Sequence, residues 1–214
     1  MTDPADFIRA NTTPATPPLV PRITLQLAKA MALLRQKLEQ EAGGNDVHPP
    51  YWACAWPGGQ ALARYLLDHP GIVAGKSVLD FGSGCGVTAI AAALAGARDV
   101  LAADLDPFAV AAIRINAAVN GVKVEVTGED IIGQDGGWQI ILVGDMFYEP
   151  VLTERLLAWL AACTKRGACV LAGDAGRNCL PGSGLEKLAT YSVTTRRELE
   201  EADFVVSSVY RLLG

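Results

Sequence analysis

From residue 77 onward, short apolar runs alternate with longer amphipathic stretches. The apolar runs are rich in Val, Ile, Leu and Ala and predict buried strands, and most are followed by a segment with helical spacing. We predict strands at 77–81, 99–104, 122–127, 139–144 and 168–172. The predicted helices are 86–96, a helix capped by Asp106 and closed by Gly121, and 150–164. This alternation is typical of a parallel sheet covered on both faces.

The last part of the chain has a different pattern. YSVTTRREL (191–199) and FVVSSVYRLL (204–213) each alternate apolar and polar residues, as a hairpin-like pair of strands does. With the five strands before them they make seven, of which the last pair is partly antiparallel. We therefore predict an α/β fold with an open, doubly wound, mostly parallel sheet.

The N-terminal region predicts a separate extension. Within residues 1–22, Pro14, Pro17, Pro18 and Pro21 stand among Thr and Ala and indicate an extended or irregular arm. From 23 to 41, apolar residues recur every three or four positions and predict one amphipathic helix. A short helix at 60–68 follows the loop PPYWACAWPGG. We predict an N-terminal arm and helix at 1–47 and one α/β domain at 48–214.

Composition narrows the class of protein. No apolar run reaches the roughly 18 residues that a membrane span needs, and the first twenty residues fit neither a secretory signal nor a transit peptide. We therefore expect a soluble, cytoplasmic protein that binds no membrane. The five cysteines show no metal-ligand spacing, so we expect free thiols and no metal. A net charge of −5 argues against nucleic acid and suits a protein partner with basic patches.

The stretch VLDFGSGCG indicates a ligand loop between a strand and a helix. Gly82, Gly84 and Gly86 let the backbone approach a ligand closely, although a tight turn alone would also use glycine. Asp104 ends the next strand about twenty residues later, where an acid can accept both hydroxyls of a ribose. The loop and Asp104 together predict a nucleoside-containing cofactor.

Asp80 favours S-adenosylmethionine over NAD. Asp80 ends the first strand of the sheet, where NAD would place its pyrophosphate, and two negative groups would repel there. S-adenosylmethionine brings an ammonium and a sulfonium to this place instead. Asp130, in the stretch GEDI, is placed either to accept from the adenine amino group or to cap a helix.

These motifs resemble the class I S-adenosylmethionine-dependent methyltransferases over residues 75–175. The stretches PYWACAWPGGQALARYLLD, GDMFYEP and GDAGR are most similar to the electron transfer flavoprotein β-subunit lysine methyltransferases in their bacterial form, and part of the pattern is shared with ribosomal protein L11 methyltransferases. The resemblance implies a seven-stranded Rossmann-like fold, S-adenosylmethionine as methyl donor, S-adenosylhomocysteine as product, and the flavoprotein β subunit as protein substrate.

The resemblance also implies roles for single residues. On this basis Trp56 borders the cofactor, although a hydrophobic plug is the alternative for Trp56 and Trp52. The other predicted cofactor residues are Asp80, Gly82 and Gly84 for the methionine part, Asp104 for the ribose and Asp130 for the adenine.

The stretch GDMFYEP predicts the substrate end of the site. A buried strand that ends in two acids and two aromatic residues is unusual for a turn. We expect Asp145 to accept a hydrogen bond from the lysine amine, and Phe147 and Tyr148 to wall its alkyl chain. Glu149 either joins them or caps the next helix. Open alternatives are a ribosomal-protein or small-amine substrate, an NAD-dependent oxidoreductase, and a cofactor-binding module without activity.

Overall fold

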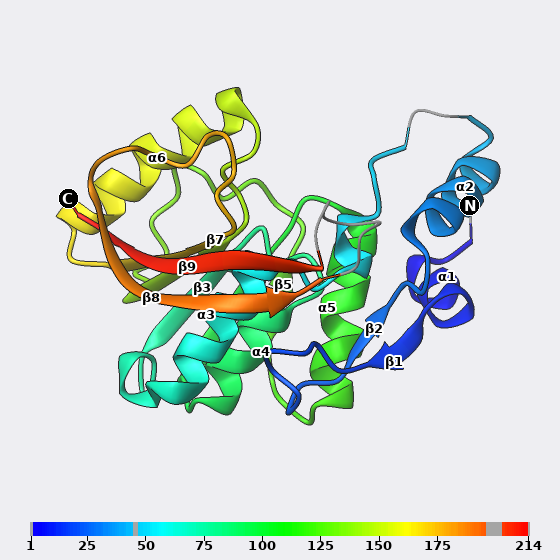
Figure 1. Cartoon of the computed structure of the whole chain (residues 1–214), viewed down its shortest axis with the longest axis horizontal. Coiled ribbons are helices and arrows are strands. Elements are labelled where there is room, and N and C mark those ends of the chain that lie inside the picture. The colour runs from blue at the N-terminus through cyan, green and yellow to red at the C-terminus, as the bar shows by residue number, and fades with distance from the viewer. Residues whose placement is uncertain (1, 45–46, 196–202, 214) are drawn as a thin grey trace.

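The computed structural model describes residues 2–44, 47–195 and 203–213 and confirms the predicted α/β fold (Figure 1). One seven-stranded sheet has the order β5-β4-β3-β6-β7-β9-β8. Its parallel strands are β3 (Ser77–Phe81), β4 (Asp99–Ala103), β5 (Glu125–Thr127), β6 (Ile140–Gly144) and β7 (Cys169–Asp174). The direction of strand addition reverses at β3, which lies between β4 and β6, and open α/β sheets bind ligands at the carboxyl ends of strands at such a point.

The last two strands are antiparallel, as predicted. β9 (Phe204–Leu212) pairs with β7, and β8 (Leu185–Thr194) pairs with β9 at the edge of the sheet. β8 begins earlier than the predicted strand at 191–199, and positions 196–199 of that prediction lie outside the described residues. β5 is shorter than the predicted strand because the Val122 amide donates to the Ala117 carbonyl at 3.1 Å and so belongs to the turn that ends the preceding helix.

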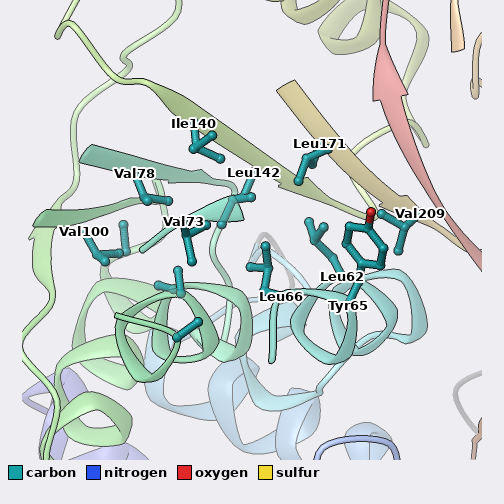
Figure 2. Packing of buried hydrophobic residues seen from close by; sticks show 14 of the residues in the cluster. Leu62, Tyr65, Leu66, Val73, Val78, Val100, Ile140, Leu142, Leu171 and Val209 are labelled. Atoms are coloured by element: carbon teal, nitrogen blue, oxygen red, sulfur yellow. The ribbon is translucent and has the colours of Figure 1, made fainter. Parts of the chain in front are cut away.

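The two faces of the sheet are covered by different helices (Figure 1). Successive residues of a strand point to opposite faces. Ile140 and Leu142 accordingly pack with Leu62 and Leu66 on the face under α3 (Pro57–Asp68) and α4 (Val87–Leu94), as Figure 2 shows. On the opposite face, Ile141 and Val143 pack against α6 (Pro150–Lys165). Both faces of the central strands are therefore buried, and polar groups are concentrated at the strand ends.

α5 (Pro107–Val119) begins as the sequence predicts. The Asp106 carboxylate accepts from the Phe108 amide at 2.8 Å, and Pro107 is the first helical residue. Gly121, at φ 64°, follows the end of the helix. Two single-turn 3₁₀ helices lie near α3: η1 (Tyr51–Ala53) before it and η2 (Pro70–Ile72) after it.

The predicted irregular arm at 1–22 is wrong in part. It contains α1 (Pro4–Asn11) and β1 (Thr13–Ala15), which pairs with β2 (Leu25–Leu27). The Asp3 side chain caps α1 by accepting from the amides of Ala5 and Asp6, and proline is tolerated in the first turn because its missing N–H would have no helical partner. Asp3 and Pro4 were therefore a helix-start signal among the other prolines.

The predicted helix at 23–41 is wrong over residues 23–30, because α2 spans Met31–Ala42. Two side chains of α5 hold the backbone before it extended. Asn120 Oδ1 accepts from the Thr24 amide at 3.0 Å, and Asn116 Oδ1 accepts from the Gln26 amide at 2.7 Å. These contacts between distant parts of the chain outweigh the local helical spacing.

The N-terminal elements pack against α5. Phe7 of α1 meets Phe108 edge-to-face at 5.5 Å between ring centroids, and Trp52 stacks on Phe108 at 5.9 Å.

The boundary between an N-terminal extension at 1–47 and an α/β domain at 48–214 stays a prediction. In the described part of the chain, no helix is both long and apolar enough to cross a membrane, and no cluster of His, Cys, Asp or Glu could hold a metal ion.

Candidate active site

The glycine loop lies at the carboxyl end of β3. Gly82, Gly84 and Gly86 all have positive φ, at 65°, 55° and 82°, a region that side chains other than glycine rarely adopt. A Cβ on Gly82 would overlap the side chain of Met146, which follows β6. The loop from β3 and the segment after β6 therefore meet at the point where strand order reverses.

Asp80 is buried beneath this loop. Its side chain is 1% exposed, and Asp80 Oδ2 accepts from Ser83 Oγ at 2.6 Å and from the Ala89 amide at 3.0 Å. Burial raises the pKa of Asp80 to about 7. Asp80 thus ties the glycine loop to the first turn of α4, and its direct contact with a cofactor stays a prediction.

Asp104 lies beside the glycine loop, and its predicted contact with a ribose is not tested. Asp104 Oδ2 accepts from the Gly84 amide at 2.8 Å, and Oδ1 accepts from the Asp106 amide at 3.0 Å. Burial raises the pKa of Asp104 above its ordinary value, while these backbone bonds favour the ionised form. Each carboxylate oxygen keeps acceptor capacity for a further donor such as a hydroxyl.

Asp130 stands on an exposed turn. Asp130 Oδ1 accepts from the Ile132 amide at 3.0 Å, and Oδ2 pairs with Arg155 Nη2 of α6 at 3.0 Å. The Arg155 guanidinium lowers the pKa of Asp130. Asp130 therefore stabilises a turn rather than capping a helix, and its predicted contact with adenine is not tested.

Asp145 follows β6 and is anchored to the start of α3. It is the only non-glycine residue with positive φ among those described, at 53°. Asp145 Oδ2 accepts from the amides of Gly58 and Gly59 at 2.5 and 3.1 Å. Trp56 precedes α3, and its indole has no acceptor. The Asp145 carboxylate, from the residue after β6, therefore takes the place of a capping side chain at the N-terminus of α3, which favours negative charge.

Glycine at 58 and 173 permits this contact. A Cβ on Gly58 would overlap the Gly173 carbonyl, and a Cβ on Gly173 would overlap the Gly58 carbonyl. The Gly173 carbonyl also accepts from the Asp145 amide at 2.9 Å. The WPGG stretch therefore brings the first turn of α3 against the ends of β6 and β7.

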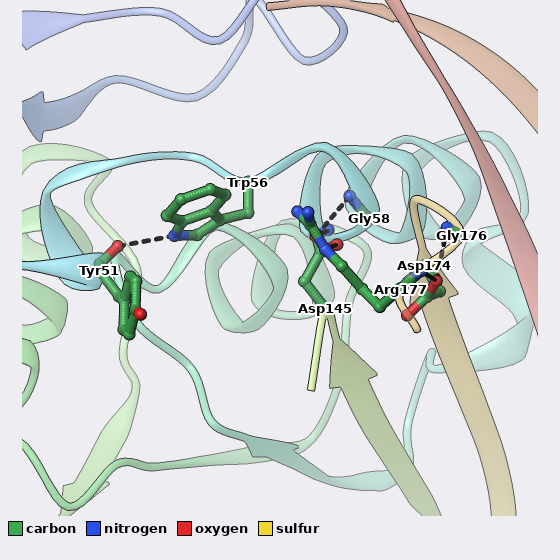
Figure 3. A network of polar contacts seen from close by, with 8 residues as sticks. Tyr51, Trp56, Gly58, Asp145, Asp174, Gly176 and Arg177 are labelled. Carbon is green, nitrogen blue, oxygen red and sulfur yellow. Dashed lines mark hydrogen bonds and ion pairs between the residues drawn. The ribbon is translucent and has the colours of Figure 1, made fainter. Parts of the chain in front are cut away.

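Arg177, on the loop after β7, completes the surroundings of Asp145 (Figure 3). Arg177 Nε donates to Asp145 Oδ1 at 3.0 Å, and the guanidinium carbon lies 5.6 Å from the centroid of the Trp56 ring. Burial raises the pKa of Asp145 to about 6, and the positive charge of Arg177 opposes that rise. Asp145 is thus a buried but charge-stabilised carboxylate.

Three aromatic rings form a cluster that includes Trp56, the ring beneath Arg177. Tyr51 lies edge-on to Trp56 at 5.7 Å between centroids and 6.1 Å from Tyr148. Trp56 Nε1 donates to the Tyr51 carbonyl at 2.9 Å, as Figure 3 shows. Tyr51 and Tyr148 are each 47% exposed. Burial, with smaller contributions from Tyr51 and Asp104, raises the pKa of the Tyr148 hydroxyl. Tyr51, Trp56 and Tyr148 form what we term the aromatic wall, and the contact of Trp56 with the cofactor stays a prediction.

Phe147 is not part of that wall, so its prediction is corrected. Its side chain is fully buried, with 0% exposure, and packs with Phe81 and Leu156 in the core under α6. Trp52 is also a core residue, at 1% exposure, which confirms the plug alternative for this tryptophan but not for Trp56. Glu149 caps α6 by accepting from the amides of Val151 and Leu152, so its capping alternative is confirmed.

The sequence reasoning missed Tyr51, Asp174 and Arg177 as site residues. A signal for Asp174 was present, because GD follows an apolar run at both 144–145 and 173–174. Asp174 is buried, and its Oδ1 accepts from the amides of Gly176 and Arg177 at 2.6 and 2.7 Å. The structure thus gathers the ends of β3, β4, β6 and β7, while Asp130 pairs with α6.

The fold and this strand-end site define a class I methyltransferase. The solved magnesium protoporphyrin IX methyltransferase from Synechocystis PCC 6803 with bound SAM has a similar fold, at a TM-score of 0.52 and 18% identity, over 70% of this chain and 76% of that one. The profile of ribosomal protein L11 methyltransferase (PrmA) matches residues 60–151.

Two relatives specify the family. Electron transfer flavoprotein beta subunit lysine methyltransferase from Xenopus laevis is 42% identical over 98% of this chain and 87% of its own length. The Homo sapiens protein of the same name is 43% identical over 75% of this chain, and the match spans 64% of that protein. The chain belongs to the family of electron transfer flavoprotein beta subunit lysine methyltransferases. This membership argues against the NAD-dependent oxidoreductase considered from the sequence.

Proposed function

We propose that this protein transfers methyl groups from S-adenosylmethionine to lysine side chains of the electron transfer flavoprotein β subunit. The observation that carries the proposal is the position of Asp145, which is linked through Arg177 to the aromatic wall and lies next in sequence to a residue that contacts the glycine loop. Met146 links the two directly, because it follows Asp145 and packs on Gly82. A cofactor on the loop and an amine at Asp145 would therefore be neighbours.

The residues around the loop fit S-adenosylmethionine. Apart from its chain neighbours, no described heavy atom lies within 4 Å of the position that a Cβ on Gly84 would take, so the loop has open space above it. Asp104, bonded to the Gly84 amide, would hold the ribose, with Gly82 and Gly84 along the methionine part and Asp130 toward the adenine. When bound, the cofactor supplies an electrophilic methyl group on a sulfonium. The Synechocystis relative in fold is described with bound SAM, which supports this choice.

The amine must reach the methyl group uncharged. With a pKa near 10.4, roughly one lysine in 2,500 is neutral at pH 7, which is about 4.6 kcal/mol uphill. The apolar faces of Tyr51, Trp56 and Tyr148 would exclude water from the lysine and so disfavour its charged form. Asp145 would accept one N–H of the amine and direct the nitrogen lone pair toward the cofactor. The ring faces would also favour the cationic methylamine products.

The proposed substrate is a folded protein surface. Tyr51 and Tyr148 are large apolar side chains left exposed, and Leu105, which follows Asp104 after β4, is 66% exposed. Exposed apolar side chains that lie together on a surface are typical of a protein interaction site. We expect transfer to the intact β subunit to exceed transfer to a short peptide that carries the same lysines.

Mass spectrometry of the purified flavoprotein after incubation with enzyme and cofactor tests the proposal. We expect added methyl groups on β-subunit lysines, and none when cofactor or enzyme is omitted. Labelling of a cell lysate with tritiated cofactor covers the alternatives. A labelled ribosomal protein or small amine, with an unlabelled flavoprotein, would replace the proposed substrate. The cytoplasmic location and the lack of a nucleic-acid partner remain predictions from composition and the net charge of −5.

A further inference from the structure

Asp145 is held by donors on both of its oxygens. The amides of Gly58 and Gly59 fix Oδ2, and Arg177 Nε fixes Oδ1. An ionised carboxylate offers about four acceptor sites. The three donors leave capacity for one more, and they hold the carboxylate plane so that this last site has a defined direction.

Arg177 is itself fixed by the loop that carries it. Asp174 Oδ1 accepts from the amides of Gly176 and Arg177, which closes a tight turn directly after β7. The Arg177 side chain is 22% exposed and lies over the Trp56 ring, with 5.6 Å between the guanidinium carbon and the ring centroid. Arg177 therefore connects the acid of the site to its aromatic wall.

We propose that Arg177 is a positioning residue for methyl transfer, which orients the Asp145 carboxylate and keeps it ionised for the incoming lysine amine. This inference rests on the proposed function, because Asp145 is assigned there to the amine. Arg177 acts through Asp145, so its loss would alter catalysis without removing a contact to the cofactor.

The electrostatics of the cluster support this role. Asp145 faces the Arg177 guanidinium from the loop after β7, the Asp174 carboxylate from the end of β7, and the amides that begin α3. Burial and Asp174 raise the pKa of Asp145, whereas Arg177 and the Gly59 amide lower it. Removing Arg177 would raise this pKa above about 6, so more of the carboxyl would be protonated near neutral pH. A protonated carboxyl is a poorer acceptor for an amine.

The test compares Arg177→Ala and Arg177→Lys with the wild-type protein. Arg166→Ala is the matched control, since Arg166 also forms an ion pair, with Asp135 at 2.9 Å, but lies beyond the C-terminus of α6. Methyl transfer to the flavoprotein β subunit is measured against pH and substrate concentration. Calorimetry with S-adenosylhomocysteine reports the cofactor site. A carbon-13 NMR titration, assigned with Asp145→Asn, measures the pKa of Asp145 without any substrate.

For Arg177→Ala we expect kcat to fall about 10-fold or more. The low-pH limb of its plot of kcat against pH should move to higher pH, and its affinity for S-adenosylhomocysteine should be unchanged. Arg177→Lys should restore the low-pH limb and part of kcat, because it keeps the charge, and Arg166→Ala should match the wild type. A wild-type pH profile in Arg177→Ala would overturn the inference, as would loss of cofactor binding in both Arg177 variants.

Failure of the proposed function gives a different result. In that case the wild-type protein itself leaves the flavoprotein unmethylated, and the NMR titration still decides the role of Arg177. A higher pKa of Asp145 in Arg177→Ala than in the wild type would show that Arg177 keeps this carboxylate ionised, and equal pKa values would overturn the inference.

Discussion

The side chain of Met146 lies against Gly82, so closely that a Cβ on Gly82 would overlap its sulfur. Gly82 opens the loop after β3, and Met146 follows Asp145 after β6. This single contact joins the proposed cofactor loop to the proposed amine site. It also explains why the first glycine of the loop has to lack a side chain, beyond its φ of 65°.

Gly82→Ala should therefore destabilise the protein twice over. The left-handed backbone costs a residue with a Cβ roughly 1–2 kcal/mol, and displacement of Met146 adds to that cost. Urea unfolding measures the loss. In the double variant with Met146→Ala the second part should disappear, so the two changes should be non-additive. Strictly additive losses would show that the contact carries no energy.

The parts of the fold that the sequence predicted correctly are those with local signals. The strands β3, β4, β6 and β7 are continuous apolar runs, and α5 carries its own cap at Asp106. The helix prediction for residues 23–30 is wrong because Asn116 and Asn120, 90 or more residues further along the chain, accept hydrogen bonds from its backbone amides. Helical spacing alone contains no trace of that contact.

The site residues also differ in whether local sequence signals predict them. Asp104 and the glycine loop were predictable because they end consecutive parallel strands that pair in register. Phe147 and Tyr148 could not be told apart, because Asp145 adopts positive φ and breaks the alternation that would assign each side chain to a face. Tyr51 and Arg177 reach Asp145 only through the tertiary fold.

Asp80 predicts a pH dependence of stability. Its folded-state pKa of about 7 lies above the unfolded value of about 3.9, so the folded protein binds more protons between these values. The free energy of unfolding should therefore fall as pH rises through this window, relative to Asp80→Asn, which cannot ionise. Urea unfolding of both proteins at pH 5 and pH 8 measures the difference. Parallel changes in the two proteins would mean that burial does not raise this pKa.

Asp104→Ala should weaken cofactor binding without unfolding the protein. It removes two proposed hydrogen bonds from the ribose to a charged acceptor, each worth about 1.5–3 kcal/mol, so affinity for S-adenosylhomocysteine should fall about 10²-fold or more. Calorimetric titration is the measurement. Asp99→Ala, which removes only an exposed ion pair with Arg98, is the control. An unchanged dissociation constant would place the ribose elsewhere.

Tyr51→Ala tests the aromatic wall. Loss of one ring face should lower kcat/KM for the β subunit about 2- to 30-fold, because cation–π contacts are worth roughly 0.5–2 kcal/mol. Tyr51→Phe keeps the ring and should stay close to the wild type, and both variants should bind S-adenosylhomocysteine normally. If kcat/KM falls as much in Tyr51→Phe as in Tyr51→Ala, the contribution of Tyr51 comes from its hydroxyl and not from its ring face.

Asp145→Asn tests whether methyl transfer needs the negative charge of Asp145. Asn keeps an oxygen for the amides of Gly58 and Gly59, so α3 should stay in place. The charge that would receive the lysine amine is lost, and so is the acceptor for Arg177 Nε, because an amide nitrogen only donates. We expect kcat to fall by roughly 10², or about 2.7 kcal/mol, with cofactor affinity within a few fold.

The most direct measurement is the rate at which wild-type protein and Asp145→Asn add methyl groups to the flavoprotein β subunit, followed by intact-protein mass spectrometry with saturating S-adenosylmethionine. We predict stepwise methylation of β-subunit lysines by the wild type and a rate lower by roughly 10² in the variant. An unmodified β subunit after incubation with the wild type would contradict the proposed substrate, and full activity of Asp145→Asn would remove Asp145 from the mechanism.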